Sequence, residues 1–239
     1  MRKFLEAPVG LAIGLALFGS APALAAGDAS DDSRATATAA TQSNDAADTS
    51  EAARSEDARR VVGWIAATGD NRSLPYVVID KNAARAFLFD GKGKYLTTAP
   101  VLIGIAPGDE ATPGIGKKSL AEIGPAEKTT PAGRFLAKFG MAAGKQKVLW
   151  VDYATSVALH TIPPGNPKER RRARMLSSTI EDNRITFGCI NVPKVFYNQG
   201  VRPLFLKKGG YVYVLPDTKS LEEVFPPLRV QPFLADSAS

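Results

Sequence analysis

Short runs rich in β-branched and aromatic residues, separated by turn signals, recur along most of the chain. Tyr76–Asp80 and Arg85–Phe89 are the first two runs, with Asp80-Lys81-Asn82 between them and Asp90-Gly91-Lys92-Gly93 after them. Further runs predict strands over 95–103, 134–139, 148–153, 157–162 and 211–215, and the segment 184–191 is expected to be extended. This succession is typical of a β meander, and the excess of strands over helices predicts a single β-rich domain.

Two segments carry helical signals instead. Residues 56–67 place Ala58, Val61, Val62 and Ile65 at helical spacing, and Gly69-Asp70-Asn71 ends the pattern. Pro193 suits the first position of a helix, which predicts a short helix to about residue 198. The fold is therefore expected to contain only a few short helices.

Two connections are longer than an ordinary loop. Gly and Pro are frequent over 104–131, and a second long insertion covers 163–183. Loops of this length without strong patterns of their own are usually functional or cover a site. We expect both to lie near a cleft.

The first residues predict export. Met1-Arg2-Lys3 is basic, residues 8–24 are apolar or small, and Ala23-Leu24-Ala25 fits a cleavage site. The alternative is a retained membrane anchor, but the apolar run is shorter than the roughly 20 residues that span a bilayer. We expect a signal peptide over 1–25, and a mature chain without a membrane span in the periplasm or cell envelope. Residues 26–55 lack aromatic side chains and predict a flexible tether, which leaves 56–239 as the folded domain.

Composition narrows the chemistry. The formal net charge is +6, which favours anionic partners. A single His and a single Cys argue against a Cys/His zinc site, and no phosphate-binding, dinucleotide-binding or G-x-S-x-G motif is present. We therefore expect no metal or cofactor, and nucleic acid is the least favoured partner because export is predicted and no recognition motif is found.

Cys189 is the first candidate for chemistry. A lone cysteine in an exported chain can form no internal disulfide, so it is expected to be either buried or used. It lies in the segment Thr186-Phe187-Gly188-Cys189-Ile190-Asn191, where a glycine allows a tight turn before the thiol. The helix predicted after Pro193 would favour a thiolate near its N-terminus.

His160 is the second candidate, and the two residues support each other. It ends a predicted strand beside a loop and is the only imidazole available as a base. Alone, Cys189 is more often a core residue and His160 a structural one. Together, in an exported chain with one of each, they predict a Cys–His catalytic pair.

These residues resemble the signature of the L,D-transpeptidases, in which a His is followed by a spacer and Ser/Thr-His-Gly-Cys-x-Asn/Arg. The upstream segments that resemble the same family are Tyr76-Val77-Val78-Ile79-Asp80, Phe87-Leu88-Phe89-Asp90, Val101-Leu102-Ile103-Gly104 and Thr130-Pro131-Ala132-Gly133-Arg134-Phe135. The similarity covers about residues 74–215. Phe187 stands where the family usually has a second His. The spacer of 28 residues is long and contains Lys168-Glu169-Arg170-Arg171-Arg172-Ala173-Arg174.

The resemblance implies a β-sandwich-type domain that acts on peptidoglycan stem peptides as a cysteine acyltransferase. Cys189 would attack the carbonyl before a terminal D-alanine, and His160 would hold the thiolate and protonate the leaving amine. The backbone N–H groups of Cys189 and Gly188 would stabilise the oxyanion, with Thr186 and Asn191 in support. The residues expected to bind substrate are Arg184, Arg170, Arg171 and Arg172.

Several alternatives remain open at this point. An amine of another stem would resolve the thioester in a transferase, whereas water would resolve it in a hydrolase of the same linkages. A non-catalytic envelope-binding module would use only the basic surface. The arginine run 170–174 is either a lid that binds substrate carboxylates or a solvated charge run. The chain is expected to act as a monomer.

Overall fold

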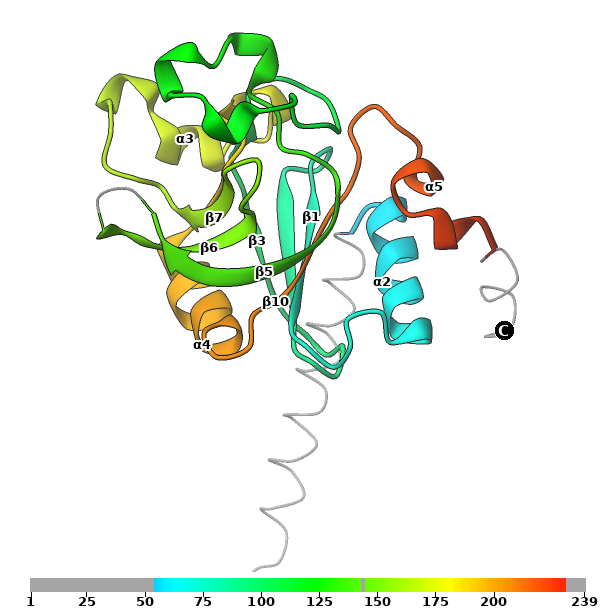
Figure 1. The fold of residues 1–239 in the computed structure, drawn as a ribbon. Coiled ribbons are helices and arrows are strands. Elements are labelled where there is room, and N and C mark those ends of the chain that lie inside the picture. Colours follow the sequence, from blue (N-terminus) through cyan, green and yellow to red (C-terminus); the bar gives the residue numbers. More distant parts are fainter. Residues whose placement is uncertain (1–53, 143–144, 231–239) are drawn as a thin grey trace, which may run out of the picture. The chain divides into compact units, whose positions relative to one another are not determined.

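The computed structural model describes residues 54–142 and 145–230 (Figure 1). The predicted signal peptide, 1–25, and the predicted tether up to residue 53 lie outside the described residues. No helix in the described part of the chain is long and apolar enough to cross a membrane.

Eight strands form one hydrogen-bonded sheet in the order β3-β2-β1-β10-β5-β6-β7-β9. Their bounds are β1 (Tyr76–Asp80), β2 (Arg85–Phe89), β3 (Tyr95–Pro100), β5 (Gly133–Met141), β6 (Lys147–Asp152), β7 (Val157–Thr161), β9 (Ile190–Val192) and β10 (Gly210–Val214). β4 (Ile103–Gly104) and β8 (Arg184–Thr186) form a separate parallel pair. Within the large sheet, β1 pairs with β10 and β7 pairs with β9 in parallel, and the other neighbours are antiparallel. The prediction of a mainly β domain is confirmed.

The large sheet curls until its two edges nearly meet. Leu102, just after β3, donates its N–H to the Asn191 carbonyl at 3.0 Å, and the Asn191 N–H donates back to the Leu102 carbonyl at 2.9 Å. This bridge joins the β3 end of the sheet to β9, so the edge next to the site is paired and does not lie open. It also explains why the strand predicted over 95–103 ends at Pro100 and resumes as β4.

The curled sheet has apolar residues on both faces. The inner face encloses the larger cluster, whose largest side chains include Leu88, Ile103, Leu149 and Phe205. On the outer face of β1, β2 and β10, a second cluster packs beneath α2 (Glu56–Thr68), α5 (Leu221–Val224) and η8 (Pro226–Val230), and Figure 1 shows α2 and α5 on the same side of the sheet. The helix predicted over 56–67 is confirmed to within a residue, with Ser55 as its N-cap.

The helical segment after β9 is longer than predicted. It is helical from Lys194, has the wider turns of a π-helix over η7 (Phe196–Val201), and continues as α4 (Arg202–Phe205). Pro203 has no N–H, and its ring would collide with the carbonyl four residues earlier in a regular α-helix. We attribute the wider turns before Pro203 to this constraint, because they relieve that contact.

The two long connections contain short helices that the sequence pattern does not reveal. Those in the first are η1 (Ile115–Lys117), η2 (Leu120–Glu122) and η3 (Pro125–Glu127), and those in the second are η5 (Pro167–Glu169), α3 (Arg171–Met175) and η6 (Ile180–Asn183). Each spans five residues or fewer, which is too short for a hydrophobic period to show in the sequence.

A buried ionic cluster ties the first long connection to the ends of three strands. Lys81, which follows β1, is fully buried, and its Nζ lies 2.9 Å from Asp109 Oδ1 and 3.4 Å from Asp217 Oδ2. The same ammonium donates to the carbonyls of Gly108 at 2.7 Å and Thr130 at 2.9 Å. Because each ammonium proton has an acceptor, the charge is tolerated in the interior.

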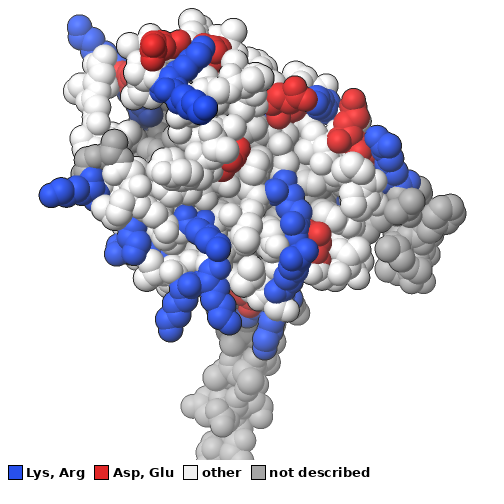
Figure 2. Space-filling view, viewed as in Figure 1, with Lys and Arg blue, Asp and Glu red and all other residues white. Residues whose placement is uncertain are grey.

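Unpaired basic side chains gather at one end of the domain, around the β5–β6 hairpin and α4 (Figure 2). The sequence has no Asp or Glu between Glu127 and Asp152 or between Asp182 and Asp217. The exposed cations in these stretches that form no ion pair with a described residue are Lys138, Lys145, Lys147, Lys194, Arg202, Lys207 and Lys208. This end of the described domain is therefore a basic surface.

Candidate active site

The parallel pairing of β7 and β9 brings the two candidate residues together. In this register His160 lies opposite Asn191, and Leu159 lies opposite Ile190. Side chains alternate between the two faces of a strand, so Cys189, two residues before Asn191, belongs to the same side as Asn191 and His160. The sheet thus places the single His and the single Cys of the chain on one face of two neighbouring strands.

A tight turn presents Cys189 at the start of β9. Gly188 has a φ of 123°, and a Cβ on it would lie 2.7 Å from the Thr129 carbonyl oxygen. The Thr186 hydroxyl accepts from the Gly188 N–H at 3.1 Å and donates to the Cys189 carbonyl at 2.6 Å. The Thr130 hydroxyl donates to the Gly188 carbonyl at 2.8 Å. The turn is therefore held on both sides by threonine hydroxyls. The Gly188 N–H is expected from the sequence to donate to an oxyanion, but it donates to the Thr186 hydroxyl instead.

We expect Gly188→Ala to lower the free energy of unfolding by about 2–4 kcal/mol, because it combines an unfavourable φ with a clash against a backbone carbonyl. Gly114→Ala is the matched control, since Gly114 also has a positive φ, of 78°, but a Cβ on it would meet no heavy atom within 4 Å. Urea unfolding should show a loss of only about 1 kcal/mol for the control. Equal losses in the two variants would contradict the close packing of this turn.

The thiol of Cys189 is only partly accessible and is not activated at rest. Its Sγ donates a hydrogen bond to the Ser156 carbonyl oxygen at 3.7 Å. Burial raises the pKa of the Cys189 thiol, and the Ala158 N–H and the Arg171 charge offset only part of this rise. The helix expected to favour a thiolate begins only at Lys194, too far from the sulfur for its dipole to dominate. At neutral pH the thiol is therefore protonated.

The imidazole of His160 is held in the neutral form. Its Nδ1 lies 2.7 Å from the Thr161 carbonyl oxygen, which can only accept, so Nδ1 carries the proton. Its Nε2 lies 3.5 Å from the Asn191 Nδ2, which can only donate. Burial lowers the pKa of His160; the Thr161 carbonyl raises it and the nearby Arg171 lowers it further. A neutral ring with an unprotonated Nε2 is the state that a general base requires.

The thiol and the imidazole share a face without a direct hydrogen bond between them. In the described residues, the sulfur is bonded to Ser156 and the Nε2 faces Asn191. Catalytic hydrogen bonds are often long before substrate binds. The two groups are therefore separately engaged, the thiol by Ser156 and the imidazole by Thr161 and Asn191.

Both long connections border this site. From the first, Gly116 packs so closely on the turn before β7 that a Cβ on it would lie 2.1 Å from the Ala154 carbonyl oxygen. The same turn contains Ser156, whose carbonyl binds the thiol. From the second, Arg171 donates to the Asn191 side chain at 3.0 Å. Each long connection therefore contacts a segment that carries one of the groups around the candidate pair.

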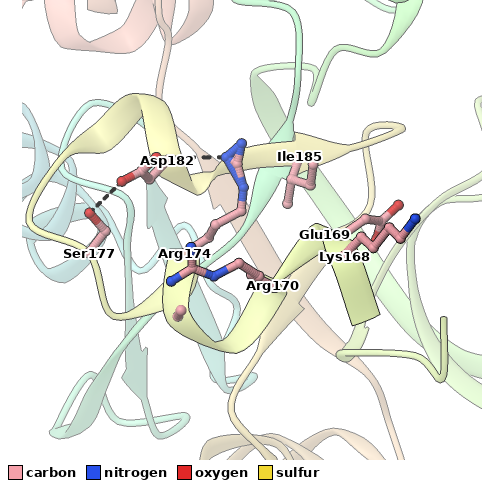
Figure 3. Close-up of a pocket in the computed structure, with 8 residues that line it drawn as sticks. Lys168, Glu169, Arg170, Arg174, Ser177, Asp182 and Ile185 are labelled. Atoms are coloured by element: carbon pink, nitrogen blue, oxygen red, sulfur yellow. Dashed lines mark hydrogen bonds and ion pairs between the residues drawn. The ribbon is translucent and has the colours of Figure 1, made fainter. Parts of the chain in front are cut away.

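The arginines of the second connection differ in their surroundings. Arg170 lines a pocket of about 640 Å³ with Lys168 and Arg174 (Figure 3). Arg172 lines a neighbouring pocket of about 390 Å³, which Arg170 and Arg171 also border. In the first pocket Arg174 pairs with Asp182 at 3.7 Å. Arg170 and Arg172 are thus available to a ligand, whereas Arg171 is largely occupied by protein groups.

Arg184 is placed differently from the other candidates. Its guanidinium donates to Asp217 at 2.8 Å, and its side chain is only 13% exposed. It belongs to the buried cluster of Lys81 and does not face the thiol. No group of three or more His, Cys, Asp or Glu side chains within 54–142 and 145–230 could hold a metal ion.

Three contributions to the site are not anticipated from the sequence. The Thr161 and Ser156 carbonyls bind the imidazole and the thiol, and the Thr130 hydroxyl holds the turn. Backbone carbonyls leave no signal in a sequence, although Thr130 lies in the Thr-Pro-x-Gly segment that carries the resemblance. Phe187, at the place of a second His, is 36% exposed and lies beneath the Lys128 Nζ, 3.8 Å from its ring centroid.

Several solved structures are similar to this chain, and two of them are L,D-transpeptidases. No protein-family model matches the chain, and no curated protein matches it. The crystal structure of an L,D-transpeptidase from Xylanimonas cellulosilytica DSM 15894 is 16% identical, with a TM-score of 0.34, over 59% of this chain and 60% of that one, so the match spans less than two thirds of that protein. The NMR structure of the catalytic domain of the E. faecium L,D-transpeptidase is 17% identical, with a TM-score of 0.31, over 59% of this chain and 95% of that one. Both of these structures are of L,D-transpeptidases, the family that the sequence motif around Cys189 resembles.

Proposed function

We propose that this chain is an exported cysteine acyltransferase of the L,D-transpeptidase type that acts on peptidoglycan stem peptides. The observation that supports the proposal best is the register of β7 and β9, in which His160 lies opposite Asn191, two residues after Cys189, in a segment that resembles the motif of this family. In this proposal residues 1–25 are a signal peptide, the following segment is a tether, and the described domain is catalytic.

The first half of the proposed reaction forms a thioester. The Cys189 sulfur attacks the carbonyl that precedes a terminal D-alanine, and the thiol proton passes to Nε2 of His160. The bond between the carbonyl carbon and the D-alanine nitrogen then breaks, and the imidazolium returns the proton to the leaving amine. Because the Thr161 carbonyl holds the ring proton on Nδ1, Nε2 is the nitrogen that can accept the thiol proton.

The second half returns the free enzyme. An amine of another stem attacks the thioester carbonyl, its proton passes to His160, and the sulfur leaves and regains a proton. The Cys189 N–H is the proposed oxyanion donor in both halves, because the Gly188 N–H is bound to Thr186. Transfer to an amine and hydrolysis by water differ only in this half.

Arg170 and Arg172 are the proposed ligands for stem carboxylates. Both border pockets on the second long connection, which reaches the candidate pair through Arg171. Guanidinium groups bind carboxylates in a bidentate manner. Arg184 is left out of this role because its guanidinium is paired with Asp217.

Mass spectrometry of products tests the proposal. We expect the full chain, incubated with purified tetrapeptide muropeptides, to release D-alanine and to yield cross-linked dimers, with a transient adduct on Cys189. Loss of D-alanine without dimers would assign the chain to hydrolysis. If D-alanine is not released, and a carbapenem forms no adduct with the thiol, the enzyme proposal fails and a binding module becomes the better account.

A further inference from the structure

The guanidinium of Arg171 is held on two sides by protein groups. Its Nε donates to Glu169 Oε2 at 2.6 Å, and its Nη1 donates to Asn191 Oδ1 at 3.0 Å. The side chain is 17% exposed. Arg170, in a left-handed conformation with a φ of 49°, turns the chain so that Arg171 begins α3. These two contacts fix the position of the Arg171 guanidinium beside Asn191.

The contact with Arg171 decides how the Asn191 amide is oriented. A guanidinium only donates, so the amide must turn its oxygen to Arg171 and its NH₂ group to His160. The NH₂ group lies 3.5 Å from Nε2 and only donates, so Nε2 accepts. The opposite orientation would set NH₂ against a guanidinium and an oxygen against the unprotonated Nε2. Asn191 is 1% exposed, so water does not compete for its amide.

We propose that Arg171 is a positioning residue of the site: anchored on Glu169, it holds the Asn191 amide in the orientation that donates to Nε2 of His160. The consequence for catalysis rests on the proposed function, but the positioning does not. Within the arginine run, Arg170 and Arg172 would then bind substrate, whereas Arg171 prepares the base before substrate arrives. The second long connection thereby influences the hydrogen bonding and the protonation of the His160 imidazole.

The electrostatics of the site agree with this geometry. The groups that face His160 are Thr161 on its own strand, Asn191 on the neighbouring strand, and Arg171 from α3. Arg171 is the charged group that acts on both reacting side chains, because it lowers the pKa of His160 and also that of the Cys189 thiol. A cation beside a neutral imidazole disfavours its protonation.

The single histidine makes a direct test possible. In the full chain labelled with ¹⁵N-histidine, only His160 contributes imidazole signals, so its titration can be followed by NMR without substrate. We expect Arg171→Met to move this titration to higher pH and to change the Nε2 resonance. Arg172→Met, which removes a neighbouring but exposed charge, should leave both unchanged. Because the charge of Arg171 alone would move the titration, the change in the Nε2 resonance, which depends on the donor from Asn191, is the readout that reports positioning.

The outcomes separate this proposal from the proposed function. A His160 titration in Arg171→Met that matches the wild type would overturn the positioning role, even if the chain transfers acyl groups. If Arg171→Met does not fold, Arg171→Lys decides, because it keeps the charge but cannot bridge Glu169 and Asn191 in the same way. In the Arg171→Lys variant, the side-chain amide resonances of Asn191 are expected to shift. Unchanged resonances would overturn the proposal. A shifted titration without muropeptide turnover would overturn the function alone.

Discussion

Cys189→Ser is expected to abolish acyl transfer, with a loss on the order of 10⁴-fold or more in the rate of adduct formation. The hydroxyl is close in shape to the thiol, so the turn held by Thr186 and Thr130 should persist. Its alkoxide is far harder to form than a thiolate, and a neutral imidazole is a weak base for a hydroxyl. Intact-mass measurement of the acyl or carbapenem adduct over time gives the rate.

A relocated thiol provides the matched control. Adding Ser178→Cys to Cys189→Ser restores one thiol to the chain, but on an exposed position of the second connection. This double variant should remain inactive towards muropeptides, although a general thiol reagent should label it. Recovery of turnover in the double variant would mean that the position of the thiol does not matter, which the proposed site cannot accommodate.

Lys81→Met is expected to have the largest effect on stability, a loss of about 3–5 kcal/mol in the free energy of unfolding. Methionine fills a similar volume but leaves Asp109, whose side chain is 1% exposed, without its cation, and leaves Asp217, 3% exposed, with Arg184 alone. The carbonyls of Gly108 and Thr130 lose a donor as well. Lys92→Met, at an exposed turn, should change stability by less than about 0.5 kcal/mol in the same urea titration.

The pH dependence of this loss has a definite sign. Burial alone would raise the pKa of Asp109, but Lys81 and the N–H groups of Asp217, Lys219 and Thr218 hold it well below its usual range. A lowered folded-state pKa contributes stability that is present above the unfolded pKa of about 3.9 and is lost as the pH falls below it. The difference between wild type and Lys81→Met should therefore narrow as the pH falls below about 4. If the difference in unfolding free energy does not change with pH, Lys81 does not stabilise the fold through the charge of the Asp109 carboxylate.

Lys81 also shows where sequence reasoning reaches its limit. Asp80-Lys81-Asn82 predicts a turn, and the structure does turn there, between β1 and β2. A lysine in a turn is expected in solvent, whereas this one is fully buried. Its partners, Asp109 and Asp217, are far away in the sequence, and only the folded chain brings them to it. Local sequence patterns predict the turn, but they do not reveal that carboxylates from distant segments will pair with Lys81 in the interior.

The same distinction applies to the strands. Runs of β-branched and aromatic residues locate β1, β2 and β7 closely, because each run is a local property. The interruptions between β3 and β4 and between β8 and β9 do not follow from these runs. The first depends on the bridge from Leu102 to Asn191, and the second on the close approach of Gly188 to Thr129.

Within the site, the sequence indicates Cys189 and His160 because they are the single Cys and the single His of the chain. The charge run predicts the same role for Arg171 as for its neighbours, because residue type does not distinguish them. Which of these arginines turns inward depends on the left-handed residue before α3 and on the contact with Asn191. Neither the handedness of a single residue nor the orientation of an amide can be inferred from residue type.

Because β7 and β9 pair directly, the spacing of their residues does not depend on the length of the chain that connects the two strands. Hydrogen bonds between the strands set the distance between His160 and Cys189, whereas the 28 residues between them only have to return to the sheet. Doubling such a connection costs only about 0.6 kcal/mol of closure entropy. Parts of this connection other than the contact of Arg171 with Asn191 can therefore be lengthened, shortened or replaced while β7 and β9 keep their register.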